Sequence, residues 1–250
     1  MPSDIKMETI NISKQYERKI ALSSISFSIQ QGELIALIGP SGAGKTTLLN
    51  ILAGFMPFDS GKLLIDQQPF STYRNRKALA KKIGVIRQQF DLIDSLAVIH
   101  NVLVGKLSDW GLLKSLFSLL FPQEKEMAIK ALERVGLAGK GYEITSTLSG
   151  GEQQRVAVAR LLVQKPEMIL ADEPVASLDP ARSDDLLAML TNIVVEQKQT
   201  LIASIHSVEY ARKYFTRIIS LKDGHVFFDL PTDQVTDAML AELYQLKEKQ

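Results

Sequence analysis

Short segments of alternating or continuous apolar residues recur along the chain and predict many β-strands. Residues 5–12 and 24–29 alternate between apolar and polar side chains, the pattern of a strand with one buried face. Residues 33–38 are mostly apolar and lead into Gly39, which is typical of a buried parallel strand. Further short apolar segments predict strands at 62–66, 83–86, 168–171, 200–205, 217–221 and 225–229.

Helical periodicity fills several of the intervals between these strands. The pattern is helical through most of 90–141, where residues 124–135 form the clearest amphipathic segment. Because strands alternate with helices, we expect an α/β fold with a mainly parallel sheet, split by an inserted helical region. Outside that region, helices are expected at 46–53, 180–195 and 232–249.

The length of the chain fits a single domain with an insertion. Its 250 residues are enough to bury a substantial core. We expect residues 1–89 and 160–250 to form the α/β core, and residues 90–159 to form the helical subdomain. The sequence contains no internal repeat and no low-complexity tract that would suggest another architecture.

Composition and charge exclude several classes of function. Hydrophobic residues make up 46% of the chain and charged residues 23%, as in folded globular proteins. The net charge of +1 provides no basic field, so nucleic acid is not expected as a partner. The lack of cysteine excludes disulfides, thiol catalysis and cysteine-based metal sites.

The apolar segments of the chain are too short to span a membrane. None approaches the roughly 18 residues that a spanning helix requires, and Lys114 interrupts the nearest candidate at 110–121. Residues 1–12 mix charged and apolar side chains and lack the apolar region of a signal peptide. We therefore expect a cytoplasmic protein that meets a membrane only through another protein.

A phosphate-binding loop is predicted directly after the strand at 33–38. Its glycines allow backbone N–H groups to turn toward an anion, and the helix that follows adds the positive end of its dipole. Lys45 is expected to reach the β- and γ-phosphates, and the Thr46 hydroxyl to bind Mg²⁺. Thr47 continues the first helical turn and belongs to the expected binding set. The motif G-x-x-x-x-G-K-[ST] is matched by Gly39, Pro40, Ser41, Gly42, Ala43, Gly44, Lys45 and Thr46.

Polar residues that suit hydrolysis follow two other predicted strands. Asp172 and Glu173 end the apolar segment at 168–171, where Asp172 is expected to hold the shell of a Mg²⁺ ion and Glu173 to take a proton from the attacking water. His206 follows the segment at 200–205. Because parallel strands end at one edge of a sheet, we expect His206 to contact the γ-phosphate there.

A second anion-binding site is predicted at the segment Leu148-Ser149-Gly150-Gly151-Glu152-Gln153. This segment resembles the LSGGQ signature of ABC ATPases and precedes a helical pattern, so Ser149 and the two glycines would lie at a helix N-terminus. One chain needs only one phosphate site for one nucleotide. The second site would therefore serve the γ-phosphate of a neighbouring copy, and two copies would enclose two ATP molecules head to tail.

From about residue 16 to residue 229, the chain resembles the ATP-binding subunits of ABC transporters. The resemblance implies a P-loop NTPase core with an N-terminal antiparallel β part and an inserted α-helical subdomain. It also implies ATP and Mg²⁺ as cofactors, with Thr46, Gln88 and Asp172 near the metal. The catalytic set that it implies is Glu173, His206, Lys45 and Gln88.

The same resemblance assigns roles to residues outside the two anion sites. Tyr16 matches an aromatic residue that stacks on adenine, and Asp179, in Ser177-Leu178-Asp179, matches a loop that contacts the partner copy. Gln88 matches a glutamine that senses Mg²⁺ and water, although Gln89 is adjacent and only the family spacing separates them. Arg87 departs from the apolar or aromatic residue usual before that glutamine.

Among ABC families, the chain most resembles the ATPases of bacterial phosphonate importers. The resemblance rests on the segments 88–90, 101–107 and 171–180, where Val175-Ala176 replaces the more usual Thr-Gly or Thr-Ser. It implies permease subunits in the membrane, a periplasmic substrate-binding protein and a place at the cytoplasmic face of the inner membrane. The apolar stretch 105–122 is either a packed helix pair or a docking surface for a permease.

Three other functions remain open at this point. The chain could serve an amino-acid importer or a lipoprotein- or macrolide-type exporter. It could be a non-transport ABC ATPase, although such proteins usually carry paired ATPase units, long coiled coils or zinc modules. It could also bind nucleotide without turnover, which the presence of Glu173 and His206 argues against.

Overall fold

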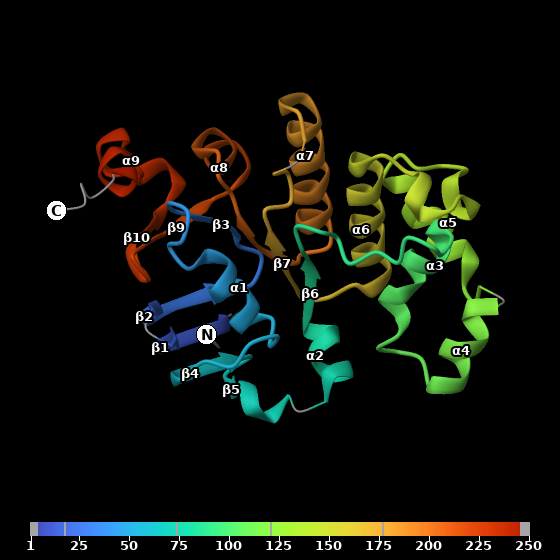
Figure 1. Ribbon diagram of the computed structural model, residues 1–250, viewed down its shortest axis with the longest axis horizontal. Coiled ribbons are helices and arrows are strands. Elements are labelled where there is room, and N and C mark those ends of the chain that lie inside the picture. Colours follow the sequence, from blue (N-terminus) through green and yellow to red (C-terminus); the bar gives the residue numbers. More distant parts are fainter. Residues whose placement is uncertain (1–4, 18, 74, 121, 177, 246–250) are drawn as a thin grey trace. The chain divides into compact units, whose positions relative to one another are not determined.

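The chain folds into two compact units, each with its own core. The computed structural model describes residues 5–17, 19–73, 75–120, 122–176 and 178–245 (Figure 1). The first unit contains Met1–Thr72, Leu170–Glu173 and Lys198–Gln250, and the second contains Tyr73–Ile169 and Pro174–Gln197. None of the helices described is long and apolar enough to cross a bilayer.

The first unit opens with an antiparallel sheet. β1 (Ile5–Tyr16) pairs with β2 (Lys19–Gln30) and with β4 (Ser60–Ile65), and β4 pairs with β5 (Gln68–Pro69). The side chains of alternate positions are buried, as the apolar alternation predicted. β1 and β2 extend beyond the predicted segments because residues 14–16 of β1 pair with residues 19–22 of β2, across register shifts that interrupt the apolar alternation. The predicted antiparallel part is confirmed.

A second sheet in the same unit positions the phosphate-binding loop. β3 (Leu34–Ile38) lies parallel to β8 (Thr200–Ser204) and to β9 (Arg217–Lys222), while β10 (His225–Pro231) returns antiparallel to β9. Every side chain of β3 and β8 is buried. The carboxyl ends of β3 and β8 therefore lie at one edge of the sheet, as we expected from their apolar sequences.

The helices of the first unit are α1 (Lys45–Leu52), α8 (Val208–Tyr214) and α9 (Asp237–Tyr244), with short 3₁₀ turns at Phe70–Thr72 and Thr232–Gln234. The prediction of one helix from 232 to 249 is wrong. A 3₁₀ turn comes first, and the Thr236 hydroxyl then accepts a hydrogen bond from the Met239 N–H and starts α9. Residues 246–250 lie outside the described residues.

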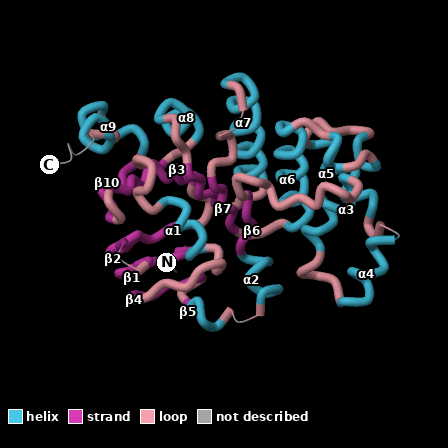
Figure 2. The backbone as a smooth tube through the Cα atoms, viewed as in Figure 1, coloured by secondary structure: helices cyan, strands magenta, loops and turns pink. Residues whose placement is uncertain are grey.

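The second unit is mostly helical (Figure 2). Its longest helices are α6 and α7, and α6 is buried along most of its length against α3 and α5. The elements are α2 (Arg76–Lys82), β6 (Ile83–Ile86), α3 (Val98–Leu103), α4 (Leu112–Leu120), α5 (Lys125–Arg134), α6 (Gly150–Gln164), the start of β7 (Met168–Asp172), α7 (Pro180–Glu196) and three 3₁₀ turns at Val104–Lys106, Lys140–Tyr142 and Thr145–Thr147.

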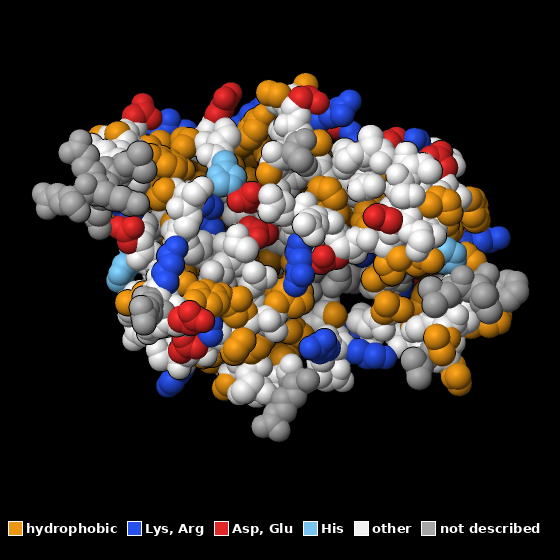
Figure 3. All heavy atoms as spheres, viewed as in Figure 1, with side chains coloured by type: hydrophobic (Ala, Val, Ile, Leu, Met, Phe, Trp, Pro, Cys, Tyr) orange, Lys and Arg blue, Asp and Glu red, His pale blue; other side chains and the backbone are white. Residues whose placement is uncertain are grey.

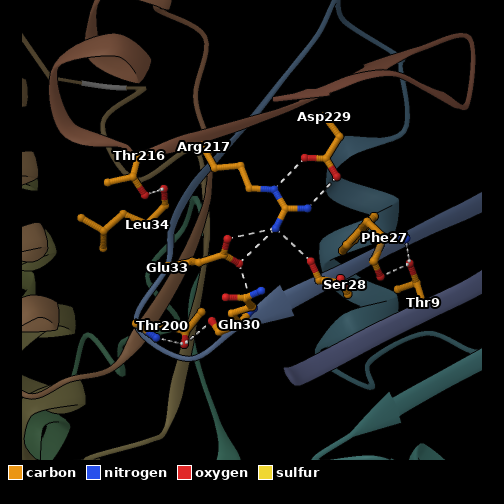
Figure 4. A network of polar contacts seen from close by, with 11 residues as sticks. Thr9, Phe27, Ser28, Gln30, Glu33, Leu34, Thr200, Thr216, Arg217 and Asp229 are labelled. Atoms are coloured by element: carbon orange, nitrogen blue, oxygen red, sulfur yellow. Dashed lines mark hydrogen bonds and ion pairs between the residues drawn. The ribbon is translucent and has the colours of Figure 1, made fainter. Parts of the chain in front are cut away.

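An ion-pair network around Arg217 connects strands of both sheets in the first unit (Figure 4). The Arg217 guanidinium makes two hydrogen bonds of 2.6 Å to the Asp229 carboxylate and contacts the Glu33 carboxylate at 3.0 and 3.1 Å. It also donates to the Ser28 carbonyl at 2.9 Å. Hydrogen bonding to Asp229 raises the pKa of Arg217 above its usual value. One side chain thus ties together β2, β9, β10 and the turn before β3.

We expect Arg217→Met to lower the free energy of unfolding by about 2 to 3 kcal/mol, because two partly buried carboxylates lose their shared cation. Urea denaturation measures this change. Arg134→Met is the matched control, since the pair between Arg134 and Glu196 is exposed and such pairs contribute about 0 to 1 kcal/mol. Equal losses in the two variants would contradict a special role for the network.

Candidate nucleotide-binding site

The loop between β3 and α1 has a backbone that only glycine can adopt at two positions. Gly39 has φ 145°, and a Cβ there would lie 2.1 Å from the Leu221 carbonyl oxygen. Gly44, the N-cap of α1, has φ 104°, and a Cβ there would lie 2.6 Å from the Ala21 carbonyl oxygen. The tight loop leaves the first N–H groups of α1 directed toward the loop, which makes a cradle for an anion.

Lys45 places a cation at this cradle. Its side chain is buried, and its Nζ donates to the carbonyl oxygens of Gly39 at 2.7 Å and Pro40 at 3.2 Å. Burial lowers the pKa of Lys45, and the nearby carboxylates of Glu173 and Asp172 act in the opposite direction. The ammonium group is therefore held inside the loop, where a phosphate group would meet it.

A polar cluster joins α1 to the ends of β7 and β8. The Thr46 hydroxyl lies 3.2 Å from Asp172 Oδ1, and the Ser204 hydroxyl donates to the same oxygen at 2.8 Å. Asp172 ends β7, whose last residues belong to the first unit, and Ser204 ends β8. The structure thus brings together the loop and the first acidic residue that the sequence singled out.

Glu173 and His206 form the second part of this cluster. His206 Nε2 lies 2.5 Å from Glu173 Oε1, and the Glu173 N–H donates to the Ser204 hydroxyl at 2.8 Å. Glu173 has φ 51°, a left-handed conformation that is uncommon for this residue type. The strained turn directs the carboxylate toward His206, so a proton acceptor and an imidazole stand beside the phosphate cradle.

Three residues near the loop were missed by the sequence analysis. Ser204 is the last residue of β8, and a serine at that position gave no distinctive signal. Lys19 had no local signal, yet its Nζ would lie only 3.9 Å from a Cβ placed on Gly42. Burial raises the pKa of Tyr244 of α9, and a hydrogen bond with the Gly39 backbone acts in the opposite direction.

We expect Ser204→Ala to lower kcat for ATP hydrolysis about tenfold with little change in nucleotide affinity, because the hydroxyl orients both acidic residues. Single-turnover and steady-state assays separate the two parameters. Ser220→Ala is the matched control, since Ser220 is also buried but bonds to the Phe228 carbonyl on β10. A similar loss of kcat in the control would point to general loosening of the sheet.

Tyr16 lies at the end of β1 in the same unit as the loop. Its hydroxyl donates to Met56 Sδ at 2.6 Å, and Lys14 Nζ lies 5.8 Å from the centre of its ring. Its side chain remains largely exposed, with a relative accessibility of 42%. A half-exposed ring is free to stack, and the adenine contact stays a prediction.

The remaining predicted residues belong to the second unit. Gln88 and Gln89 are both exposed in the turn after β6. The unusual Arg87 pairs with Asp91 at 3.3 Å, and the buried Arg160 of α6 donates to the Phe90 and Asp91 carbonyl oxygens at 2.8 and 2.9 Å. These contacts hold the loop after Gln88 within its unit, although Arg87 departs from the usual residue.

Ser149 begins α6 with a capping box. Its hydroxyl accepts from the Glu152 N–H, while the Glu152 carboxylate accepts from the Ser149 N–H. A Cβ at Gly150 would meet no described atom within 4 Å, so packing against the described residues does not explain the glycine. Asp179 caps α7 by accepting from the Arg182 N–H. Ser177 lies outside the described residues, and the roles of Gln88, Asp179 and the segment 149–152 stay predictions.

A phosphate-binding loop of this construction, inside an α/β unit of this topology, is the mark of P-loop nucleotide-binding proteins, and this chain is one of them. Residues 22–176 match the ABC transporter family. The chain belongs to the ABC transporter family. The predicted family resemblance and the predicted α/β fold class are both confirmed.

The sequences of individual relatives align with nearly the whole chain. It is 42% identical over 248 residues to the phosphonates import ATP-binding protein PhnC 1 of Nostoc sp., covering 98% of this chain and 94% of the relative. It is 45% identical over 227 residues to a protein of the same name from Pseudomonas syringae pv. tomato, covering 90% and 86%. The ATP-binding cassette MJ0796, a dimer with ADP and phosphate, superposes with a TM-score of 0.77 at 30% identity over 90% of this chain and 98% of that one.

Proposed function

We propose that this chain is the ATP-hydrolysing subunit of an ABC importer for phosphonates or a related phosphorus oxyanion. The observation that carries the ATPase part is the cluster in which Lys45, Thr46, Asp172 and Glu173 meet beside the phosphate cradle. The names of the relatives from Nostoc and Pseudomonas support the transported ligand. The substrate itself would bind elsewhere in the transporter.

The residues of the first unit can each perform one part of hydrolysis. The loop amides and Lys45 bind the β- and γ-phosphates and balance the charge that develops in the transition state. Glu173 accepts a proton from the attacking water, since it directly follows the strand that ends beside the cradle. His206, in contact with that carboxylate, orients it and lies ready to contact the γ-phosphate.

The oxygen atoms near the loop suit Mg²⁺. Thr46 Oγ1 and Asp172 Oδ1 lie 3.2 Å apart, and Mg²⁺ favours hydroxyl, carboxylate, phosphate and water oxygens. We infer that Thr46 and Asp172 would hold the ion, with Gln88 as a further contact. When bound, the ion neutralises phosphate charge.

We infer that two copies work as a head-to-tail dimer. The N-terminus of α6 carries N–H groups and a positive dipole end, and Gly150 leaves room for another molecule to approach closely. Ser149, Gly150, Gly151 and Glu152 would close over the γ-phosphate of ATP bound to the other copy, and Asp179 would contact that copy. Hydrolysis removes the bridging phosphate, which allows the dimer to open.

The remaining partners follow from the importer assignment. We expect permease subunits in the inner membrane, this chain at their cytoplasmic face and a periplasmic binding protein on the other side. Hydrophobic side chains lie on the surface in the region of α4 (Figure 3), where Leu113, Leu116 and Phe117 are exposed. Such a patch is consistent with a protein partner on the second unit.

The ligand can be tested with the intact transporter. This chain is tagged, purified from membranes together with its permease and reconstituted into liposomes, and ATP hydrolysis is measured with the cognate binding protein. Methylphosphonate should stimulate hydrolysis several-fold, whereas glutamine should not. Stimulation by an amino acid would overturn the phosphonate assignment, and the lack of any membrane partner would overturn the transport function.

A further inference from the structure

Glu152 holds the functional groups of Ser149 in the second unit. Its Oε2 accepts from the Ser149 N–H at 2.8 Å and from the Ser149 hydroxyl at 2.9 Å. A hydroxyl has one proton to donate. A carboxylate at this position therefore competes with any other anion for the proton of Ser149 and repels that anion as well.

Lys140 approaches the same carboxylate from outside α6. It lies in the 3₁₀ turn Lys140–Tyr142, and its Nζ is 2.5 Å from Glu152 Oε1 and 3.8 Å from Glu143 Oε2. Hydrogen bonding to Lys140 lowers the pKa of Glu152 to about 2, with help from Ser149, so Glu152 is an anion at neutral pH. The carboxylate thus has one oxygen on the lysine and the other on the serine.

The charge balance at this helix start depends on that lysine. With Lys140 present, the pair has no net charge, and the N–H groups of the helix keep a positive potential. Without Lys140, a bare carboxylate would stand within hydrogen-bonding distance of Ser149. A second anion would then meet like charge at close range, which disfavours its binding.

We propose that Lys140 is a positioning residue that neutralises Glu152 and so allows the start of α6 to accept the γ-phosphate of ATP held by a second copy of the chain. This inference rests on the proposed function, since it requires the ATP-bridged dimer. In the proposed dimer, Lys140 would not contact the nucleotide. Its effect is carried by Glu152 and Ser149, so it acts on dimer closure and not on nucleotide binding to one copy.

The test uses the full chain in a hydrolysis-deficient Glu173→Gln background, where ATP-dependent dimers accumulate. Light scattering gives the ATP concentration for half-maximal dimer formation. Lys140→Met should raise this concentration about five- to tenfold, while ATP affinity of the monomer, measured by equilibrium dialysis, should not change. Lys140→Arg should retain most of the wild-type response because the charge remains. Lys130→Met, an exposed lysine on α5, is the control for loss of one positive charge.

Glu152→Gln distinguishes charge neutralisation from a purely structural contact. Added to Lys140→Met, it should restore dimer formation, because a neutral amide needs no cation. The inference is overturned if Lys140→Met dimerises like its parent, or if the double variant is as impaired as Lys140→Met. Failure of the Glu173→Gln parent to dimerise with ATP would instead contradict the proposed function.

Discussion

Glu173→Gln is expected to lower ATP turnover by about 10²- to 10⁴-fold while retaining ATP binding, because a general base contributes effects of that size. The amide of glutamine can still meet the His206 imidazole, which lies 2.5 Å from the carboxylate in the wild-type chain, but it cannot take a proton. The variant should therefore bind ATP without completing the reaction. We expect ATP-dependent dimers, measured by size-exclusion chromatography coupled to light scattering.

Glu133→Gln is the matched control for this variant. Glu133 is exposed on α5, so its substitution removes the same charge without touching the cluster. It should hydrolyse ATP at the wild-type rate. Unchanged turnover in Glu173→Gln would refute the role of general base. Loss of ATP binding in that variant would show instead that Glu173 maintains the conformation of the phosphate-binding loop.

Lys45→Ala is expected to weaken ATP binding about 10- to 100-fold, since the lost charge-assisted hydrogen bonds to phosphate contribute about 1.5 to 3 kcal/mol. Burial already lowers the pKa of this ammonium group, so its charge is poorly solvated and gains from an incoming phosphate. Isothermal titration calorimetry with ATP measures the change. The thermal shift that ATP gives to the wild-type chain should shrink in parallel.

Lys62→Ala controls for the loss of one lysine in the first unit, because Lys62 is exposed on β4. Its affinity for ATP should equal that of the wild-type chain. In Lys45→Ala, the carbonyl oxygens of Gly39 and Pro40 lose their hydrogen-bond donor. The stability of the nucleotide-free variant is therefore compared with that of the wild-type chain by urea unfolding. If Lys45→Ala and Lys62→Ala bound ATP with equal affinity, Lys45 would not contribute to ATP binding.

Much of the site could be predicted because its chemistry is local in sequence. The loop motif, the acids Asp172 and Glu173, and His206 each lie at or just after the end of a short apolar strand, and parallel strands of one sheet end at one edge. Asp172 and Glu173 thus meet the loop as expected. Ser204 was missed because a serine at the end of a strand is usually unremarkable, and only the fold shows its two acidic neighbours.

Features that depend on contacts between residues far apart in the sequence could not be predicted. Arg217 forms its network with Glu33 and Asp229, and nothing in the local pattern of any of the three indicates the others. The C-terminal segment was misjudged for a related reason. Its apolar spacing suits a continuous helix, but the Thr236 cap fixes a later start for α9.

α6 carries Ser149 at its first turn and Arg160 about three turns later, roughly 16 Å along the helix axis. Arg160 grips the carbonyl groups directly after Gln88 and Gln89. One helix thus connects the predicted phosphate contact at Ser149 with the turn that contains Gln88 and Gln89. A displacement of the first turn of α6 would therefore be passed to the turn of Gln88 and Gln89 by the hydrogen bonds of Arg160.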